Sequence, residues 1–160
     1  MRKFLLLAVT FIAMSIVTSC LGAPAAQERQ DGADFSYVLG REWKLTGVFV
    51  NGQNTGFSRN ALAVQGFIDA FTISFDAERL SGAGAPNRYF AAYTLGENRA
   101  INVSMVASTM MAAIIEPEEL REHDYFFFIE HATEWNLIDG NLELLSRSRA
   151  GEEVKLIFRR

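Results

Sequence analysis

The chain has 160 residues, of which 49% are hydrophobic and 12% aromatic, and only three are proline. This composition is typical of a single folded domain and excludes a disordered or low-complexity protein, because ample apolar surface is present for burial. The 15 basic and 19 acidic residues give a net charge of −4, which argues against a nucleic-acid-binding protein, and the single cysteine excludes a disulfide-stabilised scaffold.

The N-terminal segment has the three parts of a secretory signal peptide. Residues 1–3 are a short basic head, residues 4–17 form a largely apolar run, and two small residues precede Cys20. The run is shorter than the roughly 20 residues that a transmembrane helix needs. One interpretation is a cleaved signal followed by an incidental cysteine. We favour another, because Val17-Thr18-Ser19-Cys20 resembles the lipobox of bacterial lipoproteins, in which cleavage precedes a cysteine that then carries diacylglycerol.

This resemblance implies three parts: a lipoprotein signal peptide over residues 1–19, a flexible tether over residues 20–36, and a folded domain over residues 37–160. Acylated Cys20 would then hold the protein to a lipid bilayer, since stable anchoring takes more than one acyl chain. The signal segment carries two basic residues and no acid, so its removal would change the net charge from −4 to −6. Neither Leu21 nor Gly22, the two residues after Cys20, is aspartate. In this respect the chain resembles outer-membrane lipoproteins that face the periplasm.

Alternating apolar and polar residues predict a series of short strands after residue 37. The predicted strands lie near residues 43–49, 71–75, 89–95, 101–105, 135–137, 142–144 and 154–158. Asn51-Gly52 and Asp139-Gly140 predict tight turns, and the second is typical of a type I′ hairpin.

One segment breaks the alternation. Pro117 among glutamates 116, 118 and 119 predicts the start of a helix, which we place near residues 117–130, although residues 125–129 are also compatible with a strand. The fold class is therefore mainly β (α+β): a small antiparallel barrel-like or strongly curved sheet of about eight strands with one helix. Residues 55–66 are left without an assignment.

In this order, the segments resemble the META domain found in HslJ-type bacterial lipoproteins. The resemblance covers about residues 39–159 and rests on the segments Leu39–Leu45, Phe71–Asp76, Leu80–Gly82, Asn87–Phe90, Ala107–Ala112 and Asp139–Leu144. It implies a compact β-rich domain with one helix and carries no established reaction. It singles out motif residues with a structural or partner-binding role: Trp43, Gly82, Asn87, Tyr89, Thr109 and Met111.

Two departures from the family pattern occur together. The family often has Gly-Cys-Asn where this chain has Ala85-Pro86-Asn87, and a second cysteine where this chain has Ala113. We expect Pro86 and Ala113 to lie close together in the fold, since both cysteines are missing at once.

Other candidate sites have simpler interpretations. His123 and His131 are too far apart for the usual metal-binding spacing, and Glu116, Glu119 and Glu122 are typical of a solvated helix start. We predict no metal and no cofactor. The glycine-rich residues 81–88 lack a phosphate-loop ending and predict a bend or bulge in a curved sheet. The methionines at positions 105, 110 and 111 are predicted to fill the core.

The sequence thus predicts a non-catalytic envelope lipoprotein, not an enzyme, that binds an envelope protein partner or supports the envelope stress response. The alternative is a binder of a small lipophilic ligand within the barrel, since the chain holds 13 phenylalanines, 4 tyrosines and 2 tryptophans. A hydrolase would need a nucleophile, a base and an orienting group close together, and no nucleophile-elbow motif is present.

Overall fold

The computed structural model describes residues 34–160, so the predicted signal peptide, Cys20 and most of the predicted tether lie outside the described residues. The strands are β1 (Glu42–Val50), β2 (Gln53–Asn54), β3 (Thr72–Phe75), β4 (Arg79–Ala83), β5 (Arg88–Leu95), β6 (Ile101–Val103), β7 (Ala107–Ser108), β8 (Glu134–Ile138), β9 (Asn141–Arg147) and β10 (Glu153–Arg159). The helices are α1 (Arg59–Val64) and α2 (Glu122–Glu130), with 3₁₀ turns η1 (Phe35–Tyr37) and η2 (Glu97–Arg99).

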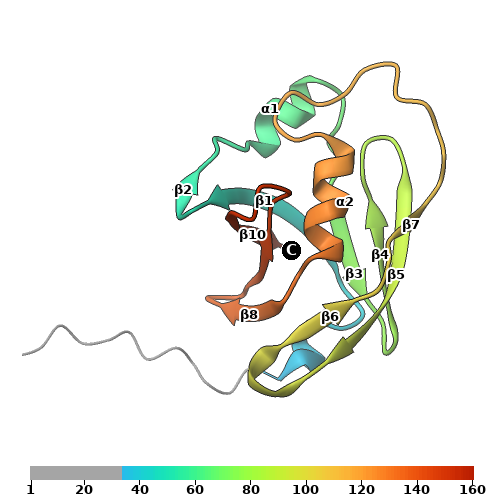
Figure 1. Ribbon diagram of the computed structural model, residues 1–160. Helices are drawn as coiled ribbons and strands as arrows, with labels where there is room; N and C mark the ends of the chain where they lie inside the picture. Colours follow the sequence, from blue (N-terminus) through green and yellow to red (C-terminus); the bar gives the residue numbers. More distant parts are fainter. Residues whose placement is uncertain (1–33) are drawn as a thin grey trace, which may run out of the picture.

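The strands form one antiparallel sheet that curls into a nearly closed barrel (Figure 1). Eight strands follow one another in the order β6-β5-β4-β3-β1-β10-β9-β8, while the short β2 and β7 pair with β1 and β5. The two edges meet through a bridge between Ala100 and Glu134, and the Ile101 N–H donates to the Thr133 carbonyl at 3.0 Å. The predicted class, a mainly β barrel-like sheet of about eight strands with one main helix, is confirmed.

Both predicted tight turns are present. Asn51 and Gly52 have φ values of 49° and 77°, and Asp139 and Gly140 have φ values of 50° and 76°. Two successive residues with positive φ define a type I′ turn, whose twist matches that of the strands it joins. These local sequence signals therefore set the β1–β2 and β8–β9 connections correctly.

Aromatic side chains fill the barrel at the end where the described chain begins. Phe35 in η1 is 6% exposed, and its ring lies 5.3 Å from that of Phe75, 5.6 Å from that of Tyr93 and 4.9 Å from that of Trp135. The packed core therefore includes a side chain from the stretch that the sequence analysis placed in the tether. Ordered structure begins ahead of residue 37.

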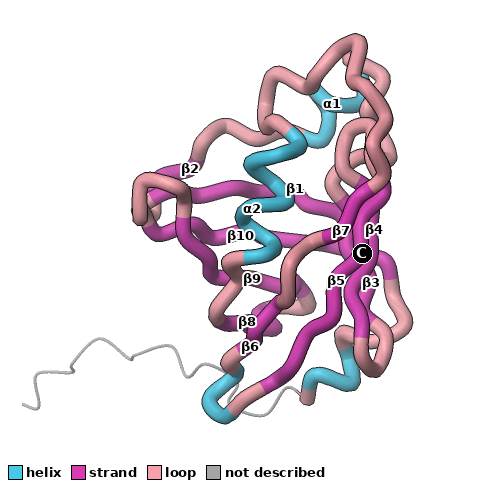
Figure 2. Tube along the Cα trace, turned by 45° about the vertical axis from the view of Figure 1, so that its right-hand side comes forward, coloured by secondary structure: helices cyan, strands magenta, loops and turns pink. Residues whose placement is uncertain are grey.

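The main helix begins later than predicted. The sequence places it near residues 117–130, but α2 starts at Glu122, and residues 118–119 form a bend (Figure 2). The reason is tertiary: the Glu118 N–H donates to Gln65 Oε1 at 3.2 Å, and Gln65 Nε2 donates to the Glu119 carboxylate at 2.9 and 3.1 Å. These contacts hold the acidic segment against the end of α1 instead of letting it continue the helix.

Gln65 follows the short helix α1, which lies in the stretch that received no assignment from the sequence. Ser58 precedes the helix and accepts the Ala61 N–H at 3.3 Å, as an N-cap residue does. Leu62 on this helix is fully buried and anchors it to the barrel.

Candidate functional site

Asn87 joins two loops at one end of the barrel. Its side chain is buried at the start of β5, where Oδ1 accepts the Thr109 hydroxyl at 2.8 Å and the Met111 N–H at 2.7 Å. Its Nδ2 also donates to the Met111 carbonyl at 3.2 Å. The amide therefore fixes the backbone of the segment that leaves β7, and three of the motif residues meet here as neighbours.

Glu122 in the first turn of α2 holds the same region from the other side. Its Oε1 accepts the N–H groups of Ala85 and Asn87, both at 2.6 Å, and its Oε2 accepts Asn87 Nδ2 at 2.7 Å. A carboxylate at a helix N-terminus also interacts favourably with the helix dipole. The interpretation of Glu122 as part of a solvated helix start is therefore wrong, because its oxygens bind the turn between β4 and β5.

Two glycines make room for this arrangement. A Cβ on Gly82 would lie 1.9 Å from the Thr72 carbonyl oxygen, and one on Gly84 would lie 2.6 Å from Glu122 Oε1 and 2.7 Å from Phe126 Cζ. Gly82 sits within β4, so its role is close approach of neighbouring backbone, whereas Gly84 lets α2 approach the turn. Both fit the predicted curved sheet better than a phosphate-binding loop.

Below this turn, two buried tyrosines share one acceptor. The hydroxyls of Tyr89 and Tyr125 each lie 2.9 Å from the Thr72 carbonyl oxygen, to which they donate, and 3.0 Å from each other. Burial is the main cause that raises the pKa of both phenols, so both remain protonated donors at neutral pH. This pair connects α2 and β5 to β3 within the core.

Trp43 lies apart from these contacts. It is fully buried on β1, its Nε1 donates to the Val38 carbonyl at 3.1 Å, and the Arg160 guanidinium lies 5.1 Å from its ring centroid. Five of the six motif residues of the domain thus belong to one connected region, which we call the Asn87 cluster: Gly82, Asn87, Tyr89, Thr109 and Met111, together with Thr72, Glu122 and Tyr125. Cys20 lies outside the described residues.

The sequence does not point to Thr72 or Tyr125 as members of this cluster, and it suggests a different role for Glu122. Glu122 and Tyr125 are three residues apart and share one face of α2, a signal that depends on knowing where the helix begins. Thr72 lies in the family segment Phe71–Asp76, but no motif singles it out; its carbonyl accepts the two tyrosine hydroxyls and its own hydroxyl accepts the Ala83 N–H at 3.2 Å. The expected proximity of Pro86 and Ala113 stays a prediction, although their near neighbours Asn87 and Met111 are hydrogen-bonded.

The methionines do not fill the core, contrary to the prediction. Met105, Met110 and Met111 are 80%, 99% and 61% exposed. β6 ends at Val103, so the alternation that suggested a buried Met105 stops before it. At Met111 the Asn87 side chain holds the backbone and leaves the thioether outside.

Other groups with possible chemistry have structural partners. His123 Nε2 lies 3.1 Å from Asp124 Oδ1, while the ring of His131 stacks on Phe127 at 3.9 Å. Over residues 34–160, no group of three or more histidine, cysteine, aspartate or glutamate side chains is placed to hold a metal ion. No helix in this part of the chain is long and apolar enough to cross a membrane.

Chemically, the Asn87 cluster is a scaffold. The Asn87 amide and the Glu122 carboxylate are engaged with backbone groups and with each other, and Thr109 also accepts the Arg88 N–H at 3.2 Å. Such groups shape a turn and present the loop that follows β7.

Comparison with known proteins agrees with this architecture. The META domain profile matches residues 36–158, and no curated protein matches the chain. Among solved structures, the chain is similar to a protein from Burkholderia xenovorans determined by NMR, with a TM-score of 0.54 and 14% sequence identity, over 85% of this chain and 98% of that one. At this identity the likeness concerns the fold alone. The profile match spans most of the chain, and the chain therefore belongs to the META domain family.

Proposed function

We propose that the protein is a non-catalytic lipoprotein of the bacterial cell envelope, anchored through acylated Cys20 and acting by binding a protein partner, in support of the envelope stress response. The observation that carries the proposal is the place of the only cysteine, directly after the apolar run and the small residues 18 and 19. An exported protein with one unpaired cysteine otherwise has an unexplained thiol.

The position of the folded domain is compatible with this arrangement. Residues 36–158 match the family, so a short stretch of small and polar residues separates Cys20 from the domain. The proposed location of the lipid anchor is the outer membrane, with the domain in the periplasm.

A scaffold role in place of catalysis is supported by the Asn87 cluster. Its polar side chains already bind backbone groups, so none of them is a free nucleophile or base beside a substrate space. The alternative of a lipophilic ligand within the barrel is less favoured, because aromatic rings such as Phe71 and Tyr125, 5.1 Å apart, are already in mutual contact there.

The proposal is tested by the intact mass of the mature protein from envelope membranes, for the wild-type chain and for Cys20→Ser. We expect the wild-type product to begin at residue 20 and to carry a diacylglyceryl-sized addition that the variant lacks. A wild-type product that keeps residues 1–19, or one that begins at residue 20 with a free thiol, would overturn the anchoring.

A further inference from the structure

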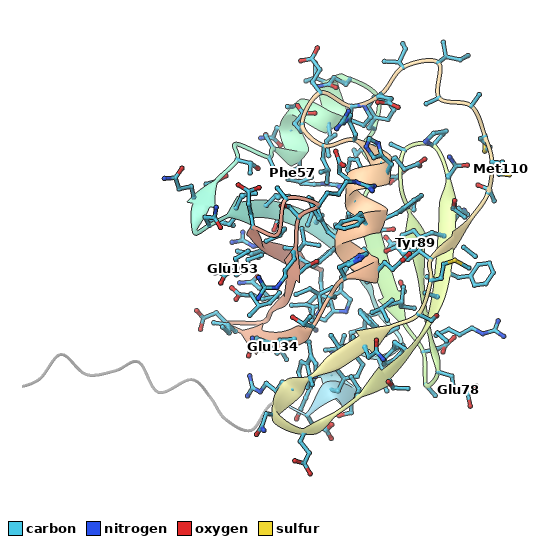
Figure 3. All side chains as sticks on the ribbon, viewed as in Figure 1. Phe57, Glu78, Tyr89, Met110, Glu134 and Glu153 are labelled. Carbon is cyan, nitrogen blue, oxygen red and sulfur yellow. The ribbon has the colours of Figure 1, made fainter. Side chains whose placement is uncertain are left out.

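The short helix α1 and the loop between β7 and α2 lie at one end of the barrel (Figures 1 and 2), and several exposed apolar residues belong to this region. Of the eleven large hydrophobic residues exposed in the described chain, six belong to α1, to the stretch that follows it or to this loop. We call them the apical patch: Val64, Ile68, Met110, Met111, Ile114 and Ile115. Val64, Met110 and Ile114 are 90%, 99% and 98% exposed, and Figure 3 shows Met110 at the outer edge of the molecule.

The loop that carries most of the patch is held at both ends. Asn87 binds the Met111 backbone through two hydrogen bonds, at 2.7 and 3.2 Å. Gln65 binds Glu118 and Glu119 at the other end, next to Val64. A loop that is already fixed at its ends loses less conformational freedom on binding, so its apolar side chains are presented at low entropic cost.

Exposed apolar side chains grouped at one end of a domain are typical of an interaction surface. We propose that the apical patch is the docking surface for an envelope protein that offers an apolar groove with lysine or arginine at its rim. This inference rests on the proposed envelope function and names the surface that the partner would contact.

The place where the tether joins the domain argues for a protein and against the anchoring membrane. The described chain starts in η1, at the end of the barrel opposite the apical patch (Figure 1). About 14 residues separate Cys20 from Asp34, and the proposed flexible tether of that length would have a root-mean-square extension of about 20 Å. A domain of this size has a radius of gyration of about 14 Å and is about 35 Å across. The proposed tether therefore joins the domain at the end away from the patch, so contact of the patch with the anchoring bilayer would require the domain to turn over.

Charge next to the patch points the same way. Glu116 and Glu118 are exposed directly after Ile115, and the neighbouring Arg121 is paired with Asp124 at 3.1 Å. Exposed carboxylates oppose contact with an anionic leaflet and complement a basic rim on a protein.

The test is photo-crosslinking in native cells with the full-length chain, with p-benzoylphenylalanine placed at Ile114 and, as the matched control, at Tyr37. Tyr37 is 55% exposed and lies at the tether end. We expect the probe at position 114, and not at 37, to join one protein, whose crosslinked peptide contains apolar residues flanked by lysine or arginine.

Charge reversal beside the patch tests whether the partner has a basic rim. In the same chain with the probe at position 114, the pair Glu116→Lys and Glu118→Lys is expected to lower the crosslinking yield about fivefold, as loss of about 1 kcal/mol of binding would. The matched pair Glu152→Lys and Glu153→Lys, at exposed sites where the β9–β10 turn leads into β10, is expected to leave it unchanged.

The inference is overturned if the probe at position 114 joins phospholipid or a second copy of this chain, if it joins nothing, or if charge reversal has no effect. Each of these results can occur with a Cys20 that carries its lipid, as judged by intact mass. Conversely, an unlipidated Cys20 with the expected crosslink would refute the anchoring and leave the docking surface standing.

Discussion

Three hydrogen bonds across the β4–β5 turn end on a single carboxylate. Glu122 accepts from two backbone N–H groups and from the Asn87 amide. Asn87 cannot turn its amide around in response to a change at Glu122, because its Oδ1 already accepts from Thr109 and Met111. Residue 122 must therefore offer two hydrogen-bond acceptors to the turn, as a carboxylate does.

Glu122→Ala is expected to lower the free energy of unfolding by about 3 kcal/mol, because it leaves partly buried N–H groups without an acceptor. Glu122→Gln should lower it by about 1–2 kcal/mol, since the glutamine NH₂ would face Asn87 Nδ2, donor against donor. Urea unfolding followed by fluorescence of the buried Trp43 and Trp135 measures both. Glu116→Ala, at an exposed position, is the control and should change stability by less than about 0.5 kcal/mol. Equal stability of Glu122→Ala and the wild type would show that the turn does not need the carboxylate.

Among the elements, the three-residue turn η1 contributes directly to the core of the barrel. Asp34 accepts the Ser36 N–H at 3.1 Å, which caps the turn, and Phe35 enters the barrel between Phe75, Tyr93 and Trp135. The turn closes one end of the barrel with an aromatic ring. It also sets the point where the preceding chain leaves the domain.

Phe35→Ala is therefore expected to lower the free energy of unfolding by about 3–4 kcal/mol, through lost burial and the cavity left behind. The neighbouring Tyr37→Ala removes a ring that is 55% exposed and should change stability by less than about 1 kcal/mol. Both are measured by thermal and urea unfolding. If the two variants were equally stable, η1 would be a peripheral part of the tether, as the sequence alone suggested.

The loop between β7 and α2 differs from η1, because its two ends are held by hydrogen bonds while its apolar side chains are exposed. The acidic segment 116–119 contacts α1 instead of starting a helix, which leaves Ile114 and Ile115 exposed. The stretch has the sequence features of a helix start, but its hydrogen bonds to Gln65 hold it in a different conformation.

For the molecule as a whole, the two buried tyrosines link stability to alkaline pH. Burial raises the pKa of Tyr89 and Tyr125 above the ordinary value of 10. The unfolded chain loses these protons near pH 10 while the folded barrel keeps them, so the stabilisation is complete below about pH 10 and declines as pH rises above it. The two protons retained by Tyr89 and Tyr125 should contribute a fall of about 2.7 kcal/mol per pH unit to the free energy of unfolding in that range.

Tyr125→Phe should make the measured slope shallower by about 1.4 kcal/mol per pH unit, because one retained proton is removed while Tyr89 still donates to Thr72. Urea unfolding at a series of pH values from 9 to about 11.5 measures the slopes. Tyr37→Phe, at an exposed ring, is the control and should keep the wild-type slope. A slope in Tyr125→Phe equal to that of the wild type would contradict the assignment.

The β class, the two tight turns and most strands could be predicted from the sequence, because alternation and Asn-Gly or Asp-Gly pairs act over a few neighbouring residues. The sequence also singled out the residues of the Asn87 cluster that carry family motifs. The contacts of these residues could not be predicted in the same way, because they join segments that are far apart in the sequence. Glu122 meets Asn87 across 35 positions of sequence, and Gln65 meets Glu119 across 54. The start of α2, the exposure of the methionines and the burial of Phe35 depend on such long-range contacts, since local propensity is equally compatible with other packings.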